Sequence, residues 1–484
     1  MLFNSIHYAI FLPIVFLLYW FVFDRFISKS KHQLRLQNAF VVVASYVFYG
    51  WWDWRFLLLI VFTSFCSWGS GLFIGKAESR KKAKVWMWLN IILNLGILAT
   101  FKYYDFFVTE FAQLFHISME GLLLKVILPV GISFYTFQAL SYSIDIYRGK
   151  IEPTKDIIAF FAFISFFPQL VAGPIERATN LLPQFLKKRE FDYDTAVDGM
   201  RQILWGLFKK IVVADNCAVY VNQVFSTYTE QTGSTLLIAA IFFTFQIYGD
   251  FSGYSDIAIG TAKLFGIKLM RNFNVPYFSR DIAEFWRRWH ISLTTWFRDY
   301  VYIPLGGSHV SKAKVVRNTF VIFLLSGFWH GANWTFIAWG AYHAILFLPL
   351  ILTGKNRKYT NQIAEGRLLP TWKEAGQILL TFFLAVFGWI IFRAESIGMA
   401  WKYVCSMCSK SLFTIPWIKS ATYFLPMPFI LALFVLLEWG GRNSEYPQPL
   451  RQPKKTWRWA TYLFFVIMVF AFGTPSESFI YFQF

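Results

Sequence analysis

The sequence predicts an all-α integral membrane protein that crosses the bilayer many times. Of its 484 residues, 56% are hydrophobic and only 15% are charged, whereas soluble domains are about 45–50% apolar and about 25% charged. Apolar runs of about 20 residues, the length that a helix needs to span a bilayer, recur from end to end. We expect roughly ten to twelve transmembrane or re-entrant helices around a central tunnel.

The first four helices follow from the apolar runs and the basic loops between them. Residues 6–23 are apolar, with no basic residue before them and no cleavage site after them, so we expect a retained helix and not a signal peptide. Basic residues cluster at 28–35, 76–84, 148–155 and 451–458. The positive-inside rule explains these clusters, and the net charge of +19, better than nucleic-acid binding does. The first three clusters are all cytoplasmic if the amino terminus lies outside, and loop 108–120, which lacks Lys and Arg, is then outside too.

The next segments combine apolar and polar residues. Residues 131–149 and 246–260 contain Gly, Ser, Asp and Gln among apolar residues, and a broken, polar backbone at membrane depth is tolerated only where it is buried in protein or lines a cavity. We therefore expect these segments to border a hydrated tunnel. Asp250 and Asp256 either pair with arginines of segment 281–300 or bind a cation or proton, and we favour the pairing.

Segment 281–300 predicts one amphipathic helix at the membrane interface. On a helical wheel its charged and hydroxyl residues share one arc, and Trp286, Trp289 and Trp296 share the opposite arc. His290 falls on the border between the arcs. It either faces a pocket beneath this helix or serves an interfacial anchor by binding a headgroup or a carbonyl.

A second histidine lies in one of the most apolar parts of the chain, in SGFWHGANW at 326–334. An ionisable side chain at membrane depth is a functional candidate. If this stretch is helical, Ser326, His330 and Asn333 share one face, so that Ser326 or Asn333 binds one ring nitrogen and leaves the other as a base. Gly327 and Gly331 form a G-x-x-x-G pattern, which allows another helix or a substrate to approach the backbone closely. A buried structural histidine fits the pattern equally well.

The remaining sequence excludes several chemistries. A polar loop at 353–376 precedes about three final hydrophobic segments, and no soluble domain is present. There is no G-x-S-x-G elbow, phosphate loop or zinc helix, and the seven histidines are too scattered for a local metal motif; His330 and His343 would lie on different helix faces. The cysteines, of which only Cys405 and Cys408 are close in sequence, are expected to be packing residues. Intramembrane His and Asp leave an enzyme and a transporter or channel both open.

Three stretches together, PVGISFYTFQALSYSIDIYRG, FWRRWHISLTTWFRDYVYIPLGG and SGFWHGANWTFIAWGAYHA, resemble the membrane-bound O-acyltransferase family. The likeness is greatest to its bacterial alginate O-acetyltransferase branch and covers most of the chain. It implies one membrane-embedded domain over 1–484, with a catalytic body at about 85–350 and final helices at about 376–475. The family's histidine in the W-H-G segment maps onto His330, and its second position maps onto His290.

The resemblance also implies a reaction. An acetyl group moves from a cytosolic acyl thioester, such as acetyl-CoA, to a polysaccharide hydroxyl outside the bacterial cytoplasmic membrane, with a periplasmic partner protein and with no metal or tightly bound cofactor. D-alanyl transfer to teichoic acid and peptidoglycan O-acetylation are the alternatives. His330 is expected to be the base, and His290 to position a substrate or polarise the thioester carbonyl. The expected tunnel or positioning residues are Ser326, Trp329, Asn333, Trp286, Asp250 and Ser252, and the expected phosphate contacts are Arg287, Arg288 and Arg298.

Overall fold

Helices make up the regular secondary structure of the computed structural model, which describes residues 1–27, 30–119, 121–416, 425–452, 454–473 and 479–480. No strand occurs in these ranges, which confirms the all-α class. The α-helices are α1 (Ile6–Leu17), α2 (Asp24–Ile27), α3 (Gln33–Asp53), α4 (Arg55–Gly75), α5 (Arg80–Lys102), α6 (Tyr104–Phe115), α7 (Ile132–Tyr147), α8 (Ile157–Ser165), α9 (Phe167–Leu170), α10 (Ala178–Phe185), α11 (Tyr193–Leu207), α12 (Asp215–Ser226), α13 (Gly233–Leu264), α14 (Ile282–Arg288), α15 (Ile291–Phe297), α16 (Lys312–His330), α17 (Trp334–Leu352), α18 (Trp372–Arg393), α19 (Ile397–Met407), α21 (Pro426–Gly440) and α22 (Lys455–Ala471). Three π-helical segments are η1 (Leu18–Phe23), η2 (Phe208–Ala214) and η5 (Arg298–Tyr302), and 3₁₀ turns are η3 (Tyr228–Glu230), η4 (Pro276–Phe278), η6 (Lys410–Phe413) and η7 (Gln448–Arg451).

The chain is built to cross a membrane several times. In the described part of the chain, six helical stretches are long and apolar enough to span a bilayer: Ile6–Ile27, Arg55–Gly75, Arg80–Lys102, Gly233–Leu264, Trp334–Leu352 and Trp372–Arg393. The larger number expected from the sequence also included shorter and more polar helices. The first breaks fall where the sequence predicts them, at the basic loops, and a further break falls at Trp54, between α3 and α4. Residues 28, 29 and 453 of the basic clusters and Glu120 of the acidic loop lie outside the described residues.

The helices form two compact units. Unit 1 comprises Met1–Ile203 and Ile257–Met270, and unit 2 comprises Leu204–Asp256 and Arg271–Phe484. The long helices α11 and α13 contribute to both. Every candidate site residue predicted from the sequence belongs to unit 2, whereas the polar segment 131–149 belongs to unit 1.

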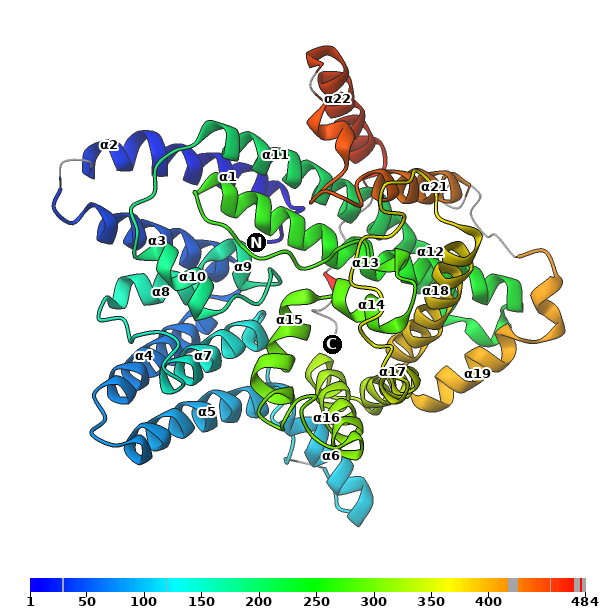
Figure 1. Ribbon diagram of the computed structural model, residues 1–484, viewed down its shortest axis with the longest axis horizontal. Helices are drawn as coiled ribbons and strands as arrows, with labels where there is room; N and C mark the ends of the chain where they lie inside the picture. Colours follow the sequence, from blue (N-terminus) through cyan, green and yellow to red (C-terminus); the bar gives the residue numbers. More distant parts are fainter. Residues whose placement is uncertain (28–29, 120, 417–424, 453, 474–478, 481–484) are drawn as a thin grey trace. The chain divides into compact units, whose positions relative to one another are not determined.

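The polar segments are continuous helices, so the expected break in their backbone is wrong. In unit 1, α7 packs on α4 and α5 (Figure 1), and the polar side chains connect the three helices: Ser67 Oγ donates to Asn90 Oδ1 at 3.0 Å, and Asn90 Nδ2 donates to Ser143 Oγ at 2.7 Å. Side chains that hydrogen-bond across helices stabilise such bundles without interrupting them. Periodicity cannot distinguish this arrangement from a polar cavity wall.

Close helix contact explains the glycines on either side of His330. Figure 1 shows α16 and α17 side by side. A methyl group on Gly327 would lie 2.2 Å from the carbonyl oxygen of Phe336, and one on Gly340 would lie 2.3 Å from the carbonyl oxygen of Phe323. The two helices therefore touch backbone to backbone, and the glycines hold the end of α16, with His330, against α17.

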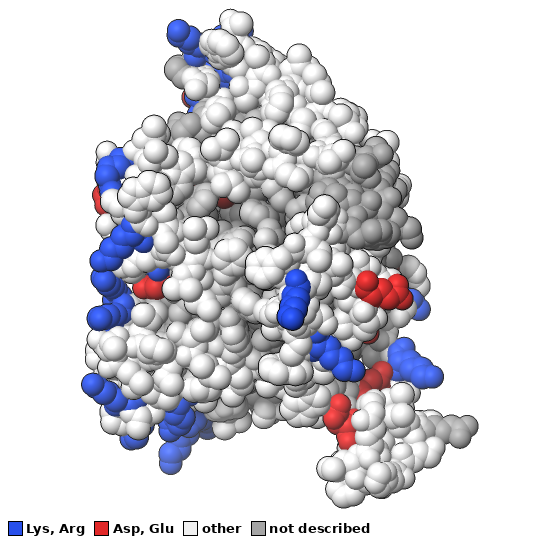
Figure 2. Space-filling view, turned by 90° about the vertical axis from the view of Figure 1, so that its right-hand side faces the viewer, with Lys and Arg blue, Asp and Glu red and all other residues white. Residues whose placement is uncertain are grey.

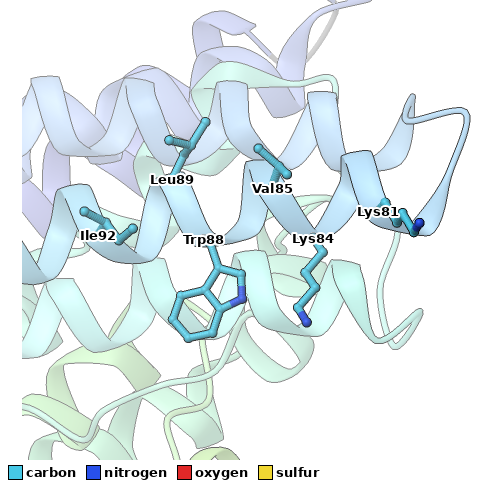
Figure 3. Close-up of a pocket in the computed structure, with 6 residues that line it drawn as sticks. All are labelled: Lys81, Lys84, Val85, Trp88, Leu89 and Ile92. Carbon is cyan, nitrogen blue, oxygen red and sulfur yellow. The ribbon is translucent and has the colours of Figure 1, made fainter.

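One face of the molecule is largely uncharged, as lipid contact requires. Figure 2 shows a face on which most residues are neither acidic nor basic. A shallow groove on α5 of unit 1 is lined by Lys81, Lys84, Val85, Trp88, Leu89 and Ile92 (Figure 3). All six residues come from a single apolar helix with lysines near one end, which suits contact with a phospholipid. This groove contains none of the candidate site residues.

Candidate active site

His290 lies at a break between two short helices. Segment 281–300 does not form the single amphipathic helix predicted, because the backbone of His290 has φ 43° and ψ 54°, in the left-handed region, and separates α14 from α15. Nor is the segment an interfacial surface helix: Trp286, Arg288 and Ser292 are all buried, from both arcs of the wheel. A left-handed non-glycine residue is costly and is found mainly at functional sites.

Asn272 holds the break and fixes the His290 ring. Asn272 Nδ2 donates to Ser255 Oγ at 3.1 Å, which leaves Oδ1 as the acceptor. That oxygen accepts from Ser292 Oγ at 2.8 Å and lies 3.1 Å from His290 Nδ1. Nδ1 therefore carries the proton, and Nε2 presents a lone pair. His290 lies outside the six candidate spans, and burial lowers its pKa to about 3, so the ring is neutral.

His330 is the last residue of α16, so only two of the three residues expected on one helical face, Ser326 and His330, lie on the same helix. Ser326 lies one turn before His330 on the same helix, and both are buried. The helix then stops at Gly331, which is extended. Asn333 instead caps α17 by accepting from the backbone nitrogen of Thr335 at 3.0 Å, and its Nδ2 donates to the carbonyl of Glu395 at 3.0 Å. Asn333 therefore orients α17 and not the His330 ring.

Trp329 brings the two histidines together. Its ring centroid lies 4.9 Å from that of His330 and 5.9 Å from that of His290. The His330 ring also lies 5.1 Å from the ring of Trp339, almost perpendicular to it. Residues 40 positions apart in the chain thus meet within one cluster. We call it the histidine cluster: His290, Trp329, His330, Trp286, Trp339, His343 and Trp389.

Buried polar atoms without a partner gather in this cluster. Within the described residues, no hydrogen-bond partner is found for His290 Nε2 or for the indole nitrogens of Trp286, Trp339 and Trp389. Ser252 Oγ on α13 is likewise buried and unpartnered within them. Buried polar groups are normally satisfied, and each exception calls for an explanation. A concentration of such groups beside two histidines is what a site for a polar substrate requires.

His343 is a cluster residue that the sequence did not assign to the site. It sits on α17, fully buried, with its ring 5.0 Å from Trp339 and 5.0 Å from Trp286. His330 and His343 contact the same indole, Trp339, from two different helices. The signal available in the sequence was a second histidine in an apolar helix.

Asp250 and Asp256 pair with lysines, not with the arginines expected from the sequence. Lys210 Nζ lies 2.8 Å from Asp250 and 2.7 Å from Asp215, and Lys209 Nζ lies 2.5 Å from Asp256. Both lysines are buried in the π-helical segment η2. The expectation of ion pairing was right, but the partners are lysines of a segment to which the sequence analysis assigned no role.

The carboxyl-terminal end of the described chain also lies beside the cluster. Asp250 accepts a hydrogen bond from the backbone nitrogen of Ile480 at 2.7 Å. Phe479 packs against Phe251 at 5.8 Å, and Phe251 contacts the His290 ring at 4.6 Å. No motif in the sequence indicated this approach.

The arginines of α14 anchor a loop. Arg288 Nη2 donates to buried Glu284 at 2.8 Å, and Arg287 donates to the carbonyls of Asn356 and Tyr359 at 2.8 and 2.6 Å. Both guanidinium groups are thus already hydrogen-bonded within the protein, that of Arg288 to α14 and that of Arg287 to the polar loop before α18. Arg298, whose side chain is 56% exposed, pairs with its neighbour Asp299 at 2.6 Å. Among the described residues, no three His, Cys, Asp or Glu side chains gather to hold a metal ion.

Comparisons with known proteins agree with this arrangement. Residues 152–387 match the sequence model of the membrane-bound O-acyltransferase family, a range that includes both histidines. The chain is 38% identical over 452 residues to the probable alginate O-acetylase AlgI of Pseudomonas aeruginosa, covering 93% of this chain and 82% of that protein. It is 36% identical over 423 residues to the peptidoglycan O-acetyltransferase of Helicobacter pylori (82% and 77% covered), and 31% identical over 282 residues to the teichoic acid D-alanyltransferase of Bacillus subtilis (55% and 69%). The enzyme alternative is therefore confirmed: the chain belongs to the membrane-bound O-acyltransferase family and is a multi-pass membrane acyltransferase.

Proposed function

We propose that this enzyme moves an acetyl group from a cytosolic acyl thioester to hydroxyl groups of a polysaccharide outside the bacterial cytoplasmic membrane. The observation that carries the proposal is the meeting of His290 and His330 on Trp329, deep inside unit 2. The relative named as an alginate O-acetylase covers nearly the whole chain, which favours an exopolysaccharide acceptor. Acetyl-CoA is the donor that we would test first.

His330 is the proposed base. A thioester is already activated, so a hydroxyl attacks it directly if a base takes the hydroxyl proton, which contributes about 10² to 10⁴ in rate. His330 then returns that proton to the departing thiolate. The close packing of α16 on α17 fixes the ring where the two substrates meet.

His290 is the proposed positioning residue for the acceptor. Because Nδ1–H is bound to Asn272, the free nitrogen of the neutral ring accepts a hydrogen bond and does not donate one. The acceptor hydroxyl is a donor and suits this nitrogen. A role in polarising the thioester carbonyl, which needs a donor, is not supported by this geometry.

Other parts of the site have supporting roles in the proposal. Trp286, Trp329, Ser326 and Ser252 line the path of the substrates, and Asp250 maintains it through Lys210. Arg298 is the preferred contact for the donor's phosphates, since Arg287 and Arg288 are engaged elsewhere. A tunnel through the body of the protein and a periplasmic partner that receives the acetyl group complete the proposal.

Substitution of His330 tests the assignment. In membranes supplied with radiolabelled acetyl-CoA, His330→Ala is expected to reduce acetyl incorporation into polymer at least roughly 100-fold, because the base is lost. His309→Ala, an exposed histidine in the loop before α16, is the matched control and should retain full activity. Equal labelling by the His330 variant and the wild type would refute the role of His330. Incorporation of radiolabelled D-alanine, or of acetyl into peptidoglycan alone, would support the other acceptors instead.

A further inference from the structure

We propose that the indole N–H of Trp339 is the hydrogen-bond donor that stabilises the oxyanion formed on the thioester carbonyl. This inference rests on the proposed function and adds a catalytic residue to it. No sequence pattern indicates this role, because Trp339 is one of many tryptophans in apolar helices.

The reaction needs such a donor. When the acceptor oxygen attacks the carbonyl carbon, a C–O bond forms and the carbonyl π electrons move to oxygen as a negative charge. The proton of the hydroxyl goes to His330. Collapse of the oxyanion restores the carbonyl and breaks the C–S bond, and the thiolate leaves with the proton from His330. Donors placed at the oxyanion before the reaction are often the largest single contribution to catalysis.

Neither histidine is available for this task. His330 takes the proton in the proposed mechanism, and the neutral His290 ring presents only a lone pair at Nε2, because its N–H is bound to Asn272. Among the described residues, Trp286, Trp339, His343 and Trp389 of the histidine cluster have buried ring nitrogens without a hydrogen-bond partner. Of these four, Trp339 is the one whose ring contacts the His330 ring.

Trp339 meets the chemical requirements. It is 0% exposed, and its indole nitrogen has no hydrogen-bond partner among the residues that the structure describes. A buried indole N–H usually finds a partner, and leaving one unmade costs about 1–3 kcal/mol. The ring lies 5.1 Å from the His330 ring, nearly perpendicular to it, so that one substrate atom can lie close to both residues.

Trp339 is also held rigidly. Its ring contacts Trp286 at 5.5 Å, His343 at 5.0 Å, Trp389 at 5.8 Å and Phe392 at 5.3 Å. A donor fixed on several sides does not have to reorganise as charge develops. This packing also gives fully buried His343 a role as a positioning residue, because its ring contacts the indole directly.

Trp339→Phe tests the inference, because phenylalanine keeps the aromatic packing and removes only the donor and one ring. Membranes that contain the periplasmic partner and either the wild type or the variant would be supplied with acetyl-CoA and acceptor polymer while release of the thiol is measured. We expect kcat to fall roughly 100-fold or more, with little change in KM. Tm should change little, since losing an unsatisfied donor offsets the smaller ring.

A second substrate separates this role from a structural one. In an acetyl dithioester analogue of acetyl-CoA, sulfur replaces the carbonyl oxygen and accepts hydrogen bonds weakly. The wild type should have a much higher kcat/KM for the thioester than for the dithioester. In Trp339→Phe this ratio should be at least roughly tenfold smaller. Should Trp339→Phe fail to fold, a tryptophan analogue with sulfur in place of the indole N–H keeps the shape and should show the same loss.

Trp20→Phe is the matched control, from unit 1. The Trp20 indole donates to the carbonyl of Leu264 at 2.8 Å, so its loss should lower Tm and leave kcat and the substrate preference unchanged. An unchanged oxygen-to-sulfur preference in Trp339→Phe, or a kcat within threefold of the wild type, would overturn the inference while the proposed function stands. Absence of thiol release by the wild type would instead refute the proposed function, and the inference with it.

Discussion

At the scale of single residues, Asn272 decides how His290 behaves. One amide oxygen receives the hydroxyl and backbone N–H of Ser292 and the Nδ1–H of His290, and the backbone of the same residue accepts from Ile291. These bonds stabilise both the left-handed backbone of His290 and the tautomer of its imidazole that is protonated at Nδ1. The chemistry of the histidine is therefore set by a residue 18 positions earlier in the chain.

Asn272→Ala should consequently damage both stability and activity. The donors that converge on the amide would lose their acceptor, at about 1–3 kcal/mol of unfolding free energy. Acetyl transfer should fall by roughly ten- to 100-fold, because a small misplacement of a reacting group has effects of that size. Thermal unfolding in detergent and acetyl incorporation are the measurements.

Asn318→Ala provides the comparison for that variant. Asn318 is also fully buried and donates to the carbonyl of Leu305 at 3.1 Å, but it lies 12 residues before His330 on α16. The Asn318→Ala variant should be less stable than the wild type but keep the same activity per folded molecule. Similar activity losses in both variants would show that Asn272 acts only through folding.

At the scale of elements, the pairing of α16 with α17 sets the position of His330. The contact is between backbones, at Gly327 and Gly340, so no side chain can rotate to relieve an added methyl group. The same contact places Trp339 and His343 of α17 beside the end of α16. The geometry of the cluster therefore depends on two glycines that touch no substrate.

Gly340→Ala should separate these helices. Its methyl group would lie 2.3 Å from the Phe323 carbonyl oxygen, and overpacking of this kind costs about 1–3 kcal/mol or more. We expect a lower Tm and a reduced kcat. Gly376→Ala on α18, where nothing lies within 4 Å, should raise stability by about 0.5–1 kcal/mol; a comparable loss there would argue that any glycine replacement is harmful.

The sequence predicted the positions of helices better than it predicted where helices end and how they are connected. Helix positions, basic loops and the final apolar segments follow from composition and periodicity, which are local properties. The break at His290 depends on Asn272, and the end of α16 depends on Asn333 capping the next helix, so both rest on partners that a helical wheel does not contain. The histidines were identified because they are rare in apolar sequence, whereas Trp339 and Lys210 resemble many similar residues.

At the scale of the whole molecule, the orientation in the membrane remains a prediction from the basic loops. Helix α5 has 23 residues, about 34 Å of helix, which exceeds the roughly 30 Å of the bilayer core. Its two ends should therefore lie on opposite sides of the membrane. Because α6 has only 12 residues and is too short to cross back, loop 76–79 should lie in the cytoplasm and loop 116–119 outside.

Single cysteines test this orientation. With Cys66, Cys217, Cys405 and Cys408 replaced by serine, a membrane-impermeant maleimide should label Ser118→Cys in cells with an intact cytoplasmic membrane. Glu78→Cys should be labelled only after that membrane is permeabilised. The opposite pattern would invert the topology and place the donor on the wrong side of the membrane for a cytosolic thioester.

The buried lysines of η2 have a consequence for how the protein is made. Lys209 pairs with Asp256, and Lys210 pairs with Asp215 and Asp250. Asp256 follows Lys209 by 47 residues. At the usual pace of the ribosome, roughly 5–20 residues per second, the first of the two lysines waits roughly 2 to 9 seconds before its carboxylate on α13 has been synthesised. During that interval the charge of Lys209 has no carboxylate partner, which is unfavourable in the apolar bilayer. We therefore expect η2 to insert into the bilayer only together with α13.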